Sequence, residues 1–254
     1  MYYVTAEREK LMEFLPKGAV GAEIGVAQGD FASVILARGA PAKLALIDPW
    51  GPDEGGVHDR GEALGLALRE RAHPAPKAPP KMENPLGDEK FRAIQDRFKG
   101  DARVAFHRQF SYRAAAAFPD KHFDFVYLDG DHRYEYVLQD LVDFAPKLKD
   151  DGLMMGHDFF EDAFAAEESY GVIGAVSAFL ARTNFVFVAL THELFPTFVL
   201  AKRLEGFAGA FLRNLLDSDV FLIDLPASIA AGYRELPHQR PDGSKRRIPS
   251  FVRA

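Results

Sequence analysis

Short apolar runs alternate with amphipathic stretches along most of the chain. The runs are rich in small, β-branched and aromatic residues and end at Gly, Pro or Asp, which predicts buried strands. They lie at residues 19–26, 43–48, 104–106, 123–129 and 153–155. Helical spacing is expected between them, over residues 5–15, 30–36, 88–99, 134–148 and 171–182. Regular alternation of strand and helix is typical of a parallel sheet covered on both faces, so we predict an α/β, Rossmann-like doubly wound fold.

The pattern changes near the C-terminus. Residues 185–190 and 196–201 are two apolar strands with a short connection, which predicts an antiparallel hairpin added to the mostly parallel sheet. Residues 203–233 are apolar and partly helical, while residues 237–254 mix Lys245-Arg246-Arg247 with Pro, Gly and Ser. We interpret that last stretch as an irregular tail or as an arm that embraces another subunit.

Length and composition favour one domain with additions. The chain has 254 residues, 48% of them hydrophobic, which is enough for one sizeable core. We expect a domain over residues 1–202 and an extension over residues 203–254 that serves in oligomerisation or in covering the substrate. Residues 51–87 are rich in Gly, Pro, Ala and charge without clear periodicity. Such a segment is a lid, a binding loop or disordered, and we favour a lid over the substrate.

Charge and composition also exclude some classes of partner. The formal net charge of -6 repels polyanions, so no nucleic-acid partner is expected. The absence of cysteine excludes disulfides, thiolate metal sites and cysteine nucleophiles. The first residues lack the order of a signal peptide, and no apolar run approaches the roughly 18 residues of a membrane span. We therefore expect a cytoplasmic protein without a membrane partner.

Two features at the ends of the first two strands point to a bound ligand. In Glu23-Ile24-Gly25-Val26-Ala27-Gln28-Gly29, glycines at a strand-to-helix turn let the backbone approach a ligand, although an ordinary tight turn has the same pattern. The third glycine of the dinucleotide fingerprint is missing, and Glu23 suits a cation better than a pyrophosphate. Asp48 ends the next strand, where a carboxylate either caps the strand or accepts both hydroxyls of a ribose.

Taken in order, these segments resemble class I S-adenosylmethionine-dependent methyltransferases, in their small-molecule O-methyltransferase branch. Glu23-Ile24-Gly25 with Gly29 resembles motif I, and Leu46-Ile47-Asp48 resembles the ribose-binding second strand. Residues 123–132 and 152–158 are similar to the fourth and fifth strands of that branch. The resemblance covers about residues 19–201 and leaves residues 51–87 and the C-terminal stretch unmatched.

The resemblance implies S-adenosylmethionine as cofactor and assigns it six binding residues. Glu23 would lie near the methionine ammonium, Gly25 and Gly29 along the methionyl and ribose part, Asp48 at the ribose hydroxyls, Ser111 at the adenine end and Asp129 at the reacting end.

Candidate catalytic and metal-binding residues follow the fourth and fifth strands. A hydroxyl acceptor must lose a proton, and histidine is suited to take it. His132 falls where catechol-type relatives keep a lysine base, so it is the first candidate for the base, with His157 second and Asp129 beside them. Metal-dependent relatives hold magnesium at positions that correspond to Asp129, His157 and Asp158. A histidine in that set indicates a softer divalent ion such as manganese, iron or zinc, or no metal.

These observations predict a methyltransferase that acts on a hydroxyl of a small-molecule acceptor, a sugar or another secondary metabolite. A noncatalytic α/β protein that binds a nucleoside or serves in assembly is the main alternative. An oxidoreductase with a nucleotide cofactor ranks lower, because of the missing glycine and of Glu23. The apolar C-terminal extension is consistent with a homodimer.

Overall fold

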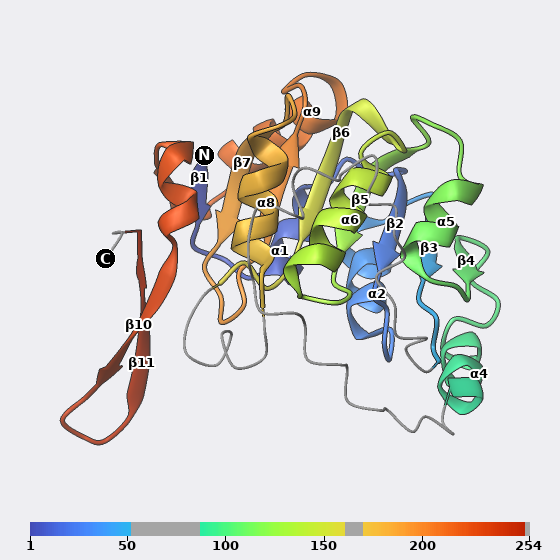
Figure 1. Cartoon of the computed structure of the whole chain (residues 1–254), viewed down its shortest axis with the longest axis horizontal. Coiled ribbons are helices and arrows are strands. Elements are labelled where there is room, and N and C mark those ends of the chain that lie inside the picture. The colour runs from blue at the N-terminus through green and yellow to red at the C-terminus, as the bar shows by residue number, and fades with distance from the viewer. Residues whose placement is uncertain (52–86, 161–169, 252–254) are drawn as a thin grey trace.

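The computed structural model describes residues 1–51, 87–160 and 170–251. In these ranges nine strands form one mostly parallel sheet in the order β4-β3-β2-β5-β6-β8-β7-β1-β9 (Figure 1). The strands are β1 (Tyr2–Val4), β2 (Val20–Ile24), β3 (Lys43–Ile47), β4 (Val104–His107), β5 (Phe123–Leu128), β6 (Leu148–Gly156), β7 (Val186–Thr191), β8 (Phe198–Ala201) and β9 (Leu222–Asp224). Only β8 and β9 run antiparallel to their neighbours in this described sheet. The predicted α/β, Rossmann-like fold is confirmed.

Helices cover both faces of the sheet and divide the interior into two cores. One face carries α5 (Ser111–Ala117), α6 (Tyr134–Phe144), α8 (Val172–Leu180) and the 3-10 helix η3 (Ala227–Gly232). The other carries α1 (Arg8–Leu11), η1 (Met12–Phe14), α2 (Asp30–Val34), the π-helix η2 (Ile35–Gly39), α4 (Gly87–Arg97) and α9 (Gly206–Leu216). Along β5, Phe125 and Tyr127 enter one core and Val126 and Leu128 the other. Because successive strand residues face opposite sides, β5 is anchored from both cores.

The antiparallel hairpin predicted at residues 185–201 is also confirmed, because β7 and β8 pair with each other. Its second strand, β8, lies between β6 and β7 and pairs with both. The buried Tyr127 hydroxyl forms a 2.9 Å hydrogen bond with the hydroxyl of Thr197, the residue directly before this second strand. The hairpin therefore continues the sheet directly beside the ends of β5 and β6.

Some element boundaries differ from those predicted. The helix expected over residues 5–15 is a single α-turn from Arg8 that tightens to 3-10 geometry at Met12. The helix expected over residues 134–148 ends at Phe144, since Pro146 cannot donate to a continuing helix. Leu148 belongs instead to β6, where it pairs with Phe123.

The first residues after position 202 pack against the rest of the chain, and the predicted division at residue 202 stays a prediction. Phe211 and Leu215 of α9 are fully buried in the same core as α1 and α2, and β9 pairs with β1. Beyond them, β10 (Arg234–Gln239) and β11 (Lys245–Ser250) form a two-stranded hairpin that projects from the body (Figure 1). We call residues 234–250 the hairpin arm. This strand pairing contradicts an irregular tail over residues 237–250, and the embrace of another subunit stays a prediction.

Two further expectations concern the lid and membrane-spanning segments. The lid expected over residues 51–87 falls, apart from its two end residues, outside the described residues. No helix in the described part of the chain is both long and apolar enough to cross a membrane.

Candidate functional site

The predicted site residues follow strands whose carboxyl ends meet at one edge of the sheet, the lower edge in Figure 1. The strand order reverses between the adjacent strands β2 and β5, since β3 and β4 lie on one side and β6 on the other. Ligands of open α/β sheets bind in the crevice at such a reversal. Glu23 lies in β2 and Gly25 directly follows it, and Asp129 directly follows β5. The topology thus brings the two halves of the predicted site together.

The turn after β2 requires glycine at two positions. Gly25 has a φ of 83°, and a Cβ atom there would lie 2.1 Å from the carbonyl oxygen of Asp129. Gly29 has a φ of 75°, and a Cβ there would lie 2.8 Å from the ring of Phe98. Residues with a Cβ rarely adopt this left-handed conformation. The two glycines therefore let the turn lie close to the loop after β5 on one side and to the Phe98 ring, just after α4, on the other.

Asp48 lies directly against this turn. One of its carboxylate oxygens accepts the backbone N–H groups of Val26 and Ala27, at 2.9 and 3.0 Å, and the other accepts that of Trp50 at 2.6 Å. A carboxylate has about four lone-pair sites, so acceptor capacity remains after these three bonds. The predicted proximity of Asp48 to the glycine turn is present, and its role at a ribose stays a prediction.

Glu23 is a buried carboxyl group with an unsatisfied oxygen. Its side chain is 1% exposed, and within the described residues its Oε2 atom has no hydrogen-bond partner. Burial raises its pKa well above the ordinary value, the negative charge of Asp129 raises it further, and Arg8 opposes both. A buried acceptor without a donor is costly. The site thus offers an acceptor for a cationic or N–H-bearing ligand group.

Asp129 is paired with a residue that the sequence reasoning missed. Arg8, from α1, donates to Asp129 Oδ2 at 2.7 Å and lies over the Phe31 ring, 4.3 Å from its centroid. Burial alone would raise the pKa of Asp129, but His157 and Arg8 together hold it below its usual value. Asp129 is therefore a carboxylate at neutral pH. No sequence signal marks Arg8, because it stands alone in a short helix far from Asp129 in the chain.

His157 lies between two carboxylates. Its Nδ1 atom is 3.2 Å from Asp158 Oδ2 and 3.5 Å from Asp129 Oδ1. Burial alone would lower its pKa, but the two carboxylates raise the pKa of His157 to about 9. At neutral pH it is an imidazolium and has no free lone pair to accept a proton.

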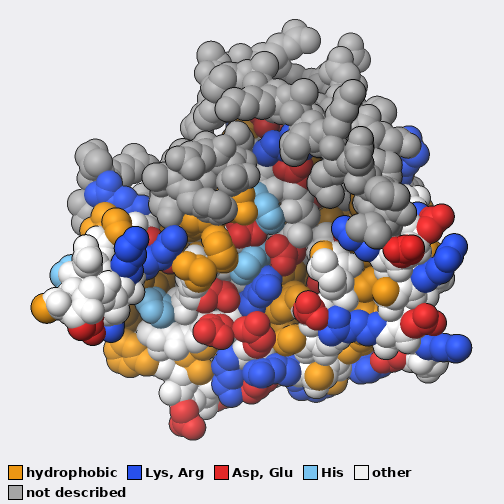
Figure 2. All heavy atoms as spheres, turned by 90° about the horizontal axis from the view of Figure 1, so that it is seen from below, with side chains coloured by type: hydrophobic (Ala, Val, Ile, Leu, Met, Phe, Trp, Pro, Cys, Tyr) orange, Lys and Arg blue, Asp and Glu red, His pale blue; other side chains and the backbone are white. Residues whose placement is uncertain are grey.

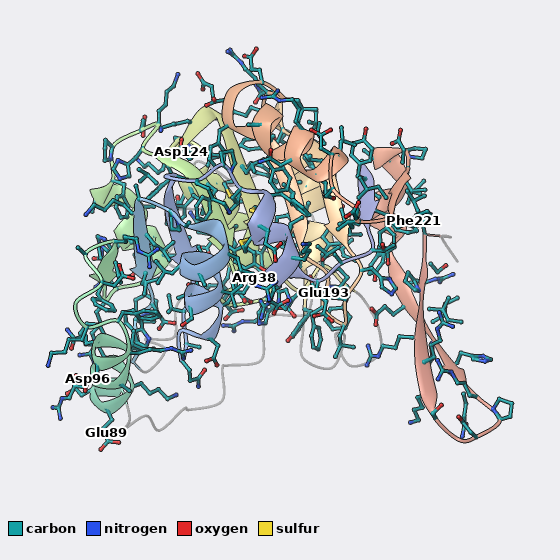
Figure 3. All side chains as sticks on the ribbon, turned by 180° about the vertical axis from the view of Figure 1, so that it is seen from behind. Arg38, Glu89, Asp96, Asp124, Glu193 and Phe221 are labelled. Atoms are coloured by element: carbon teal, nitrogen blue, oxygen red, sulfur yellow. The ribbon has the colours of Figure 1, made fainter. Side chains whose placement is uncertain are left out.

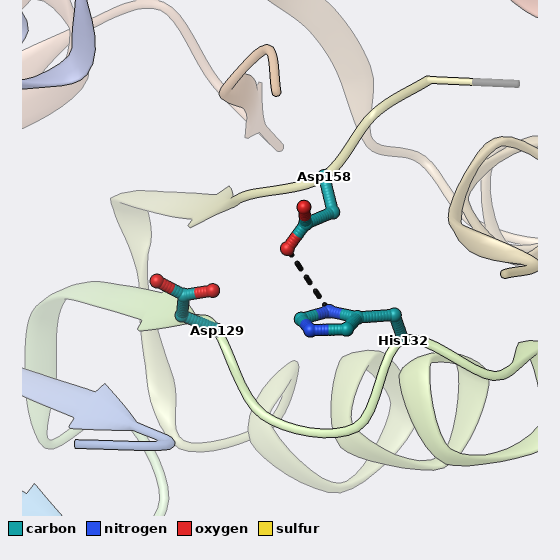
Figure 4. Close-up of side chains that lie close together, drawn as sticks. All are labelled: Asp129, His132 and Asp158. Atoms are coloured by element: carbon teal, nitrogen blue, oxygen red, sulfur yellow. Dashed lines mark ion pairs between the residues drawn. The ribbon is translucent and has the colours of Figure 1, made fainter. Parts of the chain in front are cut away.

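His132 has a different environment, although it also contacts Asp158. Its Nδ1 atom lies 3.0 Å from Asp158 Oδ2, and the imidazole is 30% exposed. Figure 4 marks this contact with a dashed line. Asp158 is buried and has a φ of 58°, which is uncommon for a residue other than glycine. Such strain persists where the surrounding structure fixes it, often at functional sites. The Nδ1 atoms of both His132 and His157 lie near this buried carboxylate.

Among the described residues, one group of three has ligand atoms close enough for a metal ion, namely Asp129, His132 and Asp158, within 4.8 Å of one another. The predicted set had His157 in place of His132, and as a metal-binding set it stays a prediction. Two cations, Arg8 and protonated His157, already neutralise the two carboxylates. Arg8 already donates to one carboxylate oxygen of Asp129, and protonated His157 lies beside both carboxylates, so a divalent ion bound here would compete with two cations.

Ser111 lies at the start of α5 and contacts a second group that the sequence reasoning missed. It forms a hydrogen bond with the buried carboxyl group of Asp140. Burial raises the pKa of Asp140 to about 7, and the hydrogen bond from Ser111 partly opposes this rise. Asp140 lines a small cavity together with Gly130 and His132. Ser111 is therefore linked to the loop after β5 through α6, and its contact with an adenine stays a prediction.

Charged and imidazole side chains gather on the face that bears the carboxyl edge (Figure 2). Glu193, labelled in Figure 3 at this edge, follows β7 and interacts with Arg8 and His157. Around Asp129 the site thus draws polar groups from α1 and from the loops after β5, β6 and β7, in addition to Glu23 of β2 and Asp48 after β3.

Comparisons with known proteins bear on the family and the fold. A family model described as a methyltransferase domain matches residues 22–159. A comparison with curated proteins gave no match. Among solved structures, an S-adenosylmethionine-dependent methyltransferase from Aquifex aeolicus has 14% identity and a TM-score of 0.50, over 78% of this chain and 90% of its own. The N-methyltransferase NodS from Bradyrhizobium japonicum has 11% identity and a TM-score of 0.49, over 75% and 91%.

Proposed function

Because the chain belongs to this methyltransferase domain family, we propose that it moves the methyl group of S-adenosylmethionine to a hydroxyl of a small-molecule acceptor. The contact between His132 and Asp158 carries the proposal. It places an oriented imidazole beside Asp129, the acid at the predicted reacting end of the cofactor. The family match supports S-adenosylmethionine as the methyl donor, and the imidazole supports a hydroxyl as the acceptor.

The cofactor would lie across the turn after β2. The unsatisfied oxygen of Glu23 suits the methionine ammonium, and the remaining acceptor capacity of Asp48 suits a ribose hydroxyl. Gly25 and Gly29 allow the backbone to approach the ligand, and Ser111 would lie toward the adenine. Each of these proposed contacts uses a residue that lies at or after the carboxyl end of a strand of the parallel sheet.

The imidazole of His132 supplies the base. When Nδ1–H donates to Asp158, the lone pair of the neutral ring is on Nε2, which can take a proton from an acceptor hydroxyl. His157 remains protonated and holds Asp129 and Asp158 in place by its charge, so its role is positioning rather than proton removal. Methyl transfer itself is an in-line displacement for which orientation supplies much of the rate.

The presence of a base favours oxygen over nitrogen as the acceptor atom. A neutral amine already has a nucleophilic lone pair, whereas a hydroxyl becomes strongly nucleophilic only as it loses its proton. A sugar or another polyhydroxylated secondary metabolite therefore suits this site better than an amine.

Product formation tests the proposal directly. The protein is incubated with labelled S-adenosylmethionine and matched panels of polyhydroxylated molecules, amines and short RNAs. We expect label on a hydroxyl and formation of S-adenosylhomocysteine, and about a tenfold weaker cofactor affinity in Asp48→Ala by calorimetry, since a charged hydrogen bond is lost. Transfer only to amines or RNA, or cofactor binding without any transfer, would contradict the proposal.

Glu23 should contribute both to the pH dependence of stability and to cofactor affinity. Because its folded-state pKa lies above that of the unfolded chain, the stability due to its bound proton is present at acidic pH and is lost as pH rises through the raised pKa. Glu23→Gln should flatten this decline in Tm of the ligand-free protein. It should also weaken S-adenosylmethionine binding by about 10- to 100-fold. Melting curves and calorimetry over pH measure both effects, with the exposed Glu89→Gln as control. An unchanged pH dependence would show that Glu23 is not the titrating group.

Metal removal should leave the reaction intact. Arg8 and His157 already balance the carboxylates of the site, so we expect chelator-treated protein to keep its turnover of the identified acceptor. The measurement compares kcat before and after removal of metal, with readdition of manganese, zinc and magnesium. Loss of activity that one of these ions restores would instead support the metal-dependent route predicted from the sequence.

A further inference from the structure

The hairpin arm leaves apolar side chains exposed. Leu236 and Ile248 are cross-strand partners, so they lie on the same face, and they are 42% and 41% exposed. An isolated two-stranded hairpin is marginally stable in water. Figure 3 shows the arm extending away from the body, so its far half has no support from the described core. The arm has the features of an element that packs on a second molecule.

Its charge is opposite to that of the rest of the chain. Residues 234–250 contain five basic and two acidic residues, a formal charge of +3 in a chain of -6, which leaves -9 on all other residues. Arg240, Lys245 and Arg246 are exposed. The arm therefore suits an acidic surface with apolar positions.

Such a surface lies on the sheet edge beside the arm. Phe221 and Ile223 are 67% and 40% exposed there, among the exposed Asp217, Asp219 and Asp224. We call these five residues the edge patch, and Figure 3 labels Phe221 within it. β9 is the last strand of the described sheet, and an unpaired edge strand is a common place of association. An open groove of about 470 Å³ lies between this edge and the base of the arm, with Ile223 and Leu225 on one side and Pro249 and Phe251 on the other.

We propose that two copies of the chain form a symmetric dimer in which the hairpin arm of each copy lies on the edge patch of the other. Leu236 and Ile248 of one copy then fill the groove beside Ile223 of its partner, and the basic side chains face the aspartates. A twofold arrangement is closed, because both copies contribute the arm and the patch. The proposal does not depend on the proposed function.

Sedimentation of the full-length protein tests the dimer. We expect a dimer at about 100 μM, where even micromolar affinity gives a measurable fraction. The double variant Leu236→Glu/Ile248→Glu should be monomeric, whereas Leu204→Glu, at a position that is 49% exposed outside both surfaces, should remain dimeric. Circular dichroism checks that the variants are folded. A monomeric wild type, or a double variant that stays dimeric, would overturn the proposal.

A charge exchange identifies the surfaces. Lys245→Glu/Arg246→Glu reverses charge on the arm, and Asp217→Lys/Asp219→Lys reverses it on the edge patch. Each variant alone should dimerise at least about tenfold more weakly, because like charges would face each other. Mixed together they should form a heterodimer, since both interfaces again pair opposite charges. Failure of the mixture to associate would refute the pairing. Binding of a short RNA duplex that is lost in the arm variant alone, with no wild-type dimer, would assign the arm to nucleic acid instead.

Discussion

Replacement of His132 by Gln should lower kcat for the hydroxyl acceptor by about 10²- to 10⁴-fold, the usual contribution of a positioned general base. The reason is that the contact with Asp158 occupies Nδ1 of His132 and leaves the lone pair on Nε2 free to accept a proton from the hydroxyl. The affinity for S-adenosylmethionine should change little, because the cofactor contacts lie at Glu23, Gly25 and Asp48. Single-turnover kinetics and calorimetry measure the two quantities separately.

Two comparisons separate proton removal from a merely structural role. Asp158→Asn should also lower kcat, because an amide can favour the wrong tautomer of His132, and it should alter the pH profile of kcat/KM. His122→Gln, at the opposite edge of the sheet beside Phe118, should leave kcat unchanged. Turnover by His132→Gln within about tenfold of the wild type would remove His132 from the role of base.

The fold was predictable where the apolar pattern was long enough to interpret. Strands such as β5 and β3 are buried on both faces, so their apolar runs stand out in the sequence. β1 has only three residues, Tyr2–Val4, and becomes a strand through pairing with β7 and β9 rather than through its own pattern. The insertion of β8 between β6 and β7 is likewise a tertiary feature. Neither could be deduced from local periodicity.

The proximity of the candidate residues was predictable from the sequence, but their electrostatics were not. Residues at the carboxyl ends of parallel strands, or directly after them, reach the same edge, which predicted that Glu23, Asp48 and Asp129 lie near one another. Arg8 reaches Asp129 only because α1 folds back across the sheet, and the two residues are 121 positions apart in sequence. The different environments of the two histidines depend on contacts of 3.0 to 3.5 Å between their Nδ1 atoms and the neighbouring carboxylates. Sequence spacing carries no information at that scale.

Gly25→Ala should weaken both the fold and the cofactor site. Its φ of 83° disfavours any Cβ, and the new atom would lie 2.1 Å from the backbone oxygen of Asp129, which cannot rotate away. We expect a loss of about 2–5 kcal/mol in the free energy of unfolding, from backbone strain and steric overlap together. A displaced turn should also weaken S-adenosylmethionine binding by about 100-fold, since a shift near 1 Å at a site has effects of that size.

Gly100→Ala is the matched control for Gly25→Ala. Gly100 has nearly the same conformation, with a φ of 84°, but a Cβ there would meet no atom within 4 Å. It should therefore cost only about 1 kcal/mol of strain and leave cofactor affinity unchanged. Thermal melts and calorimetry on both variants measure the difference. The close approach between the turns after β2 and β5 predicts that Gly25→Ala loses more stability and more cofactor affinity than Gly100→Ala. Equal losses in the two variants would mean that backbone strain alone accounts for the effect at Gly25.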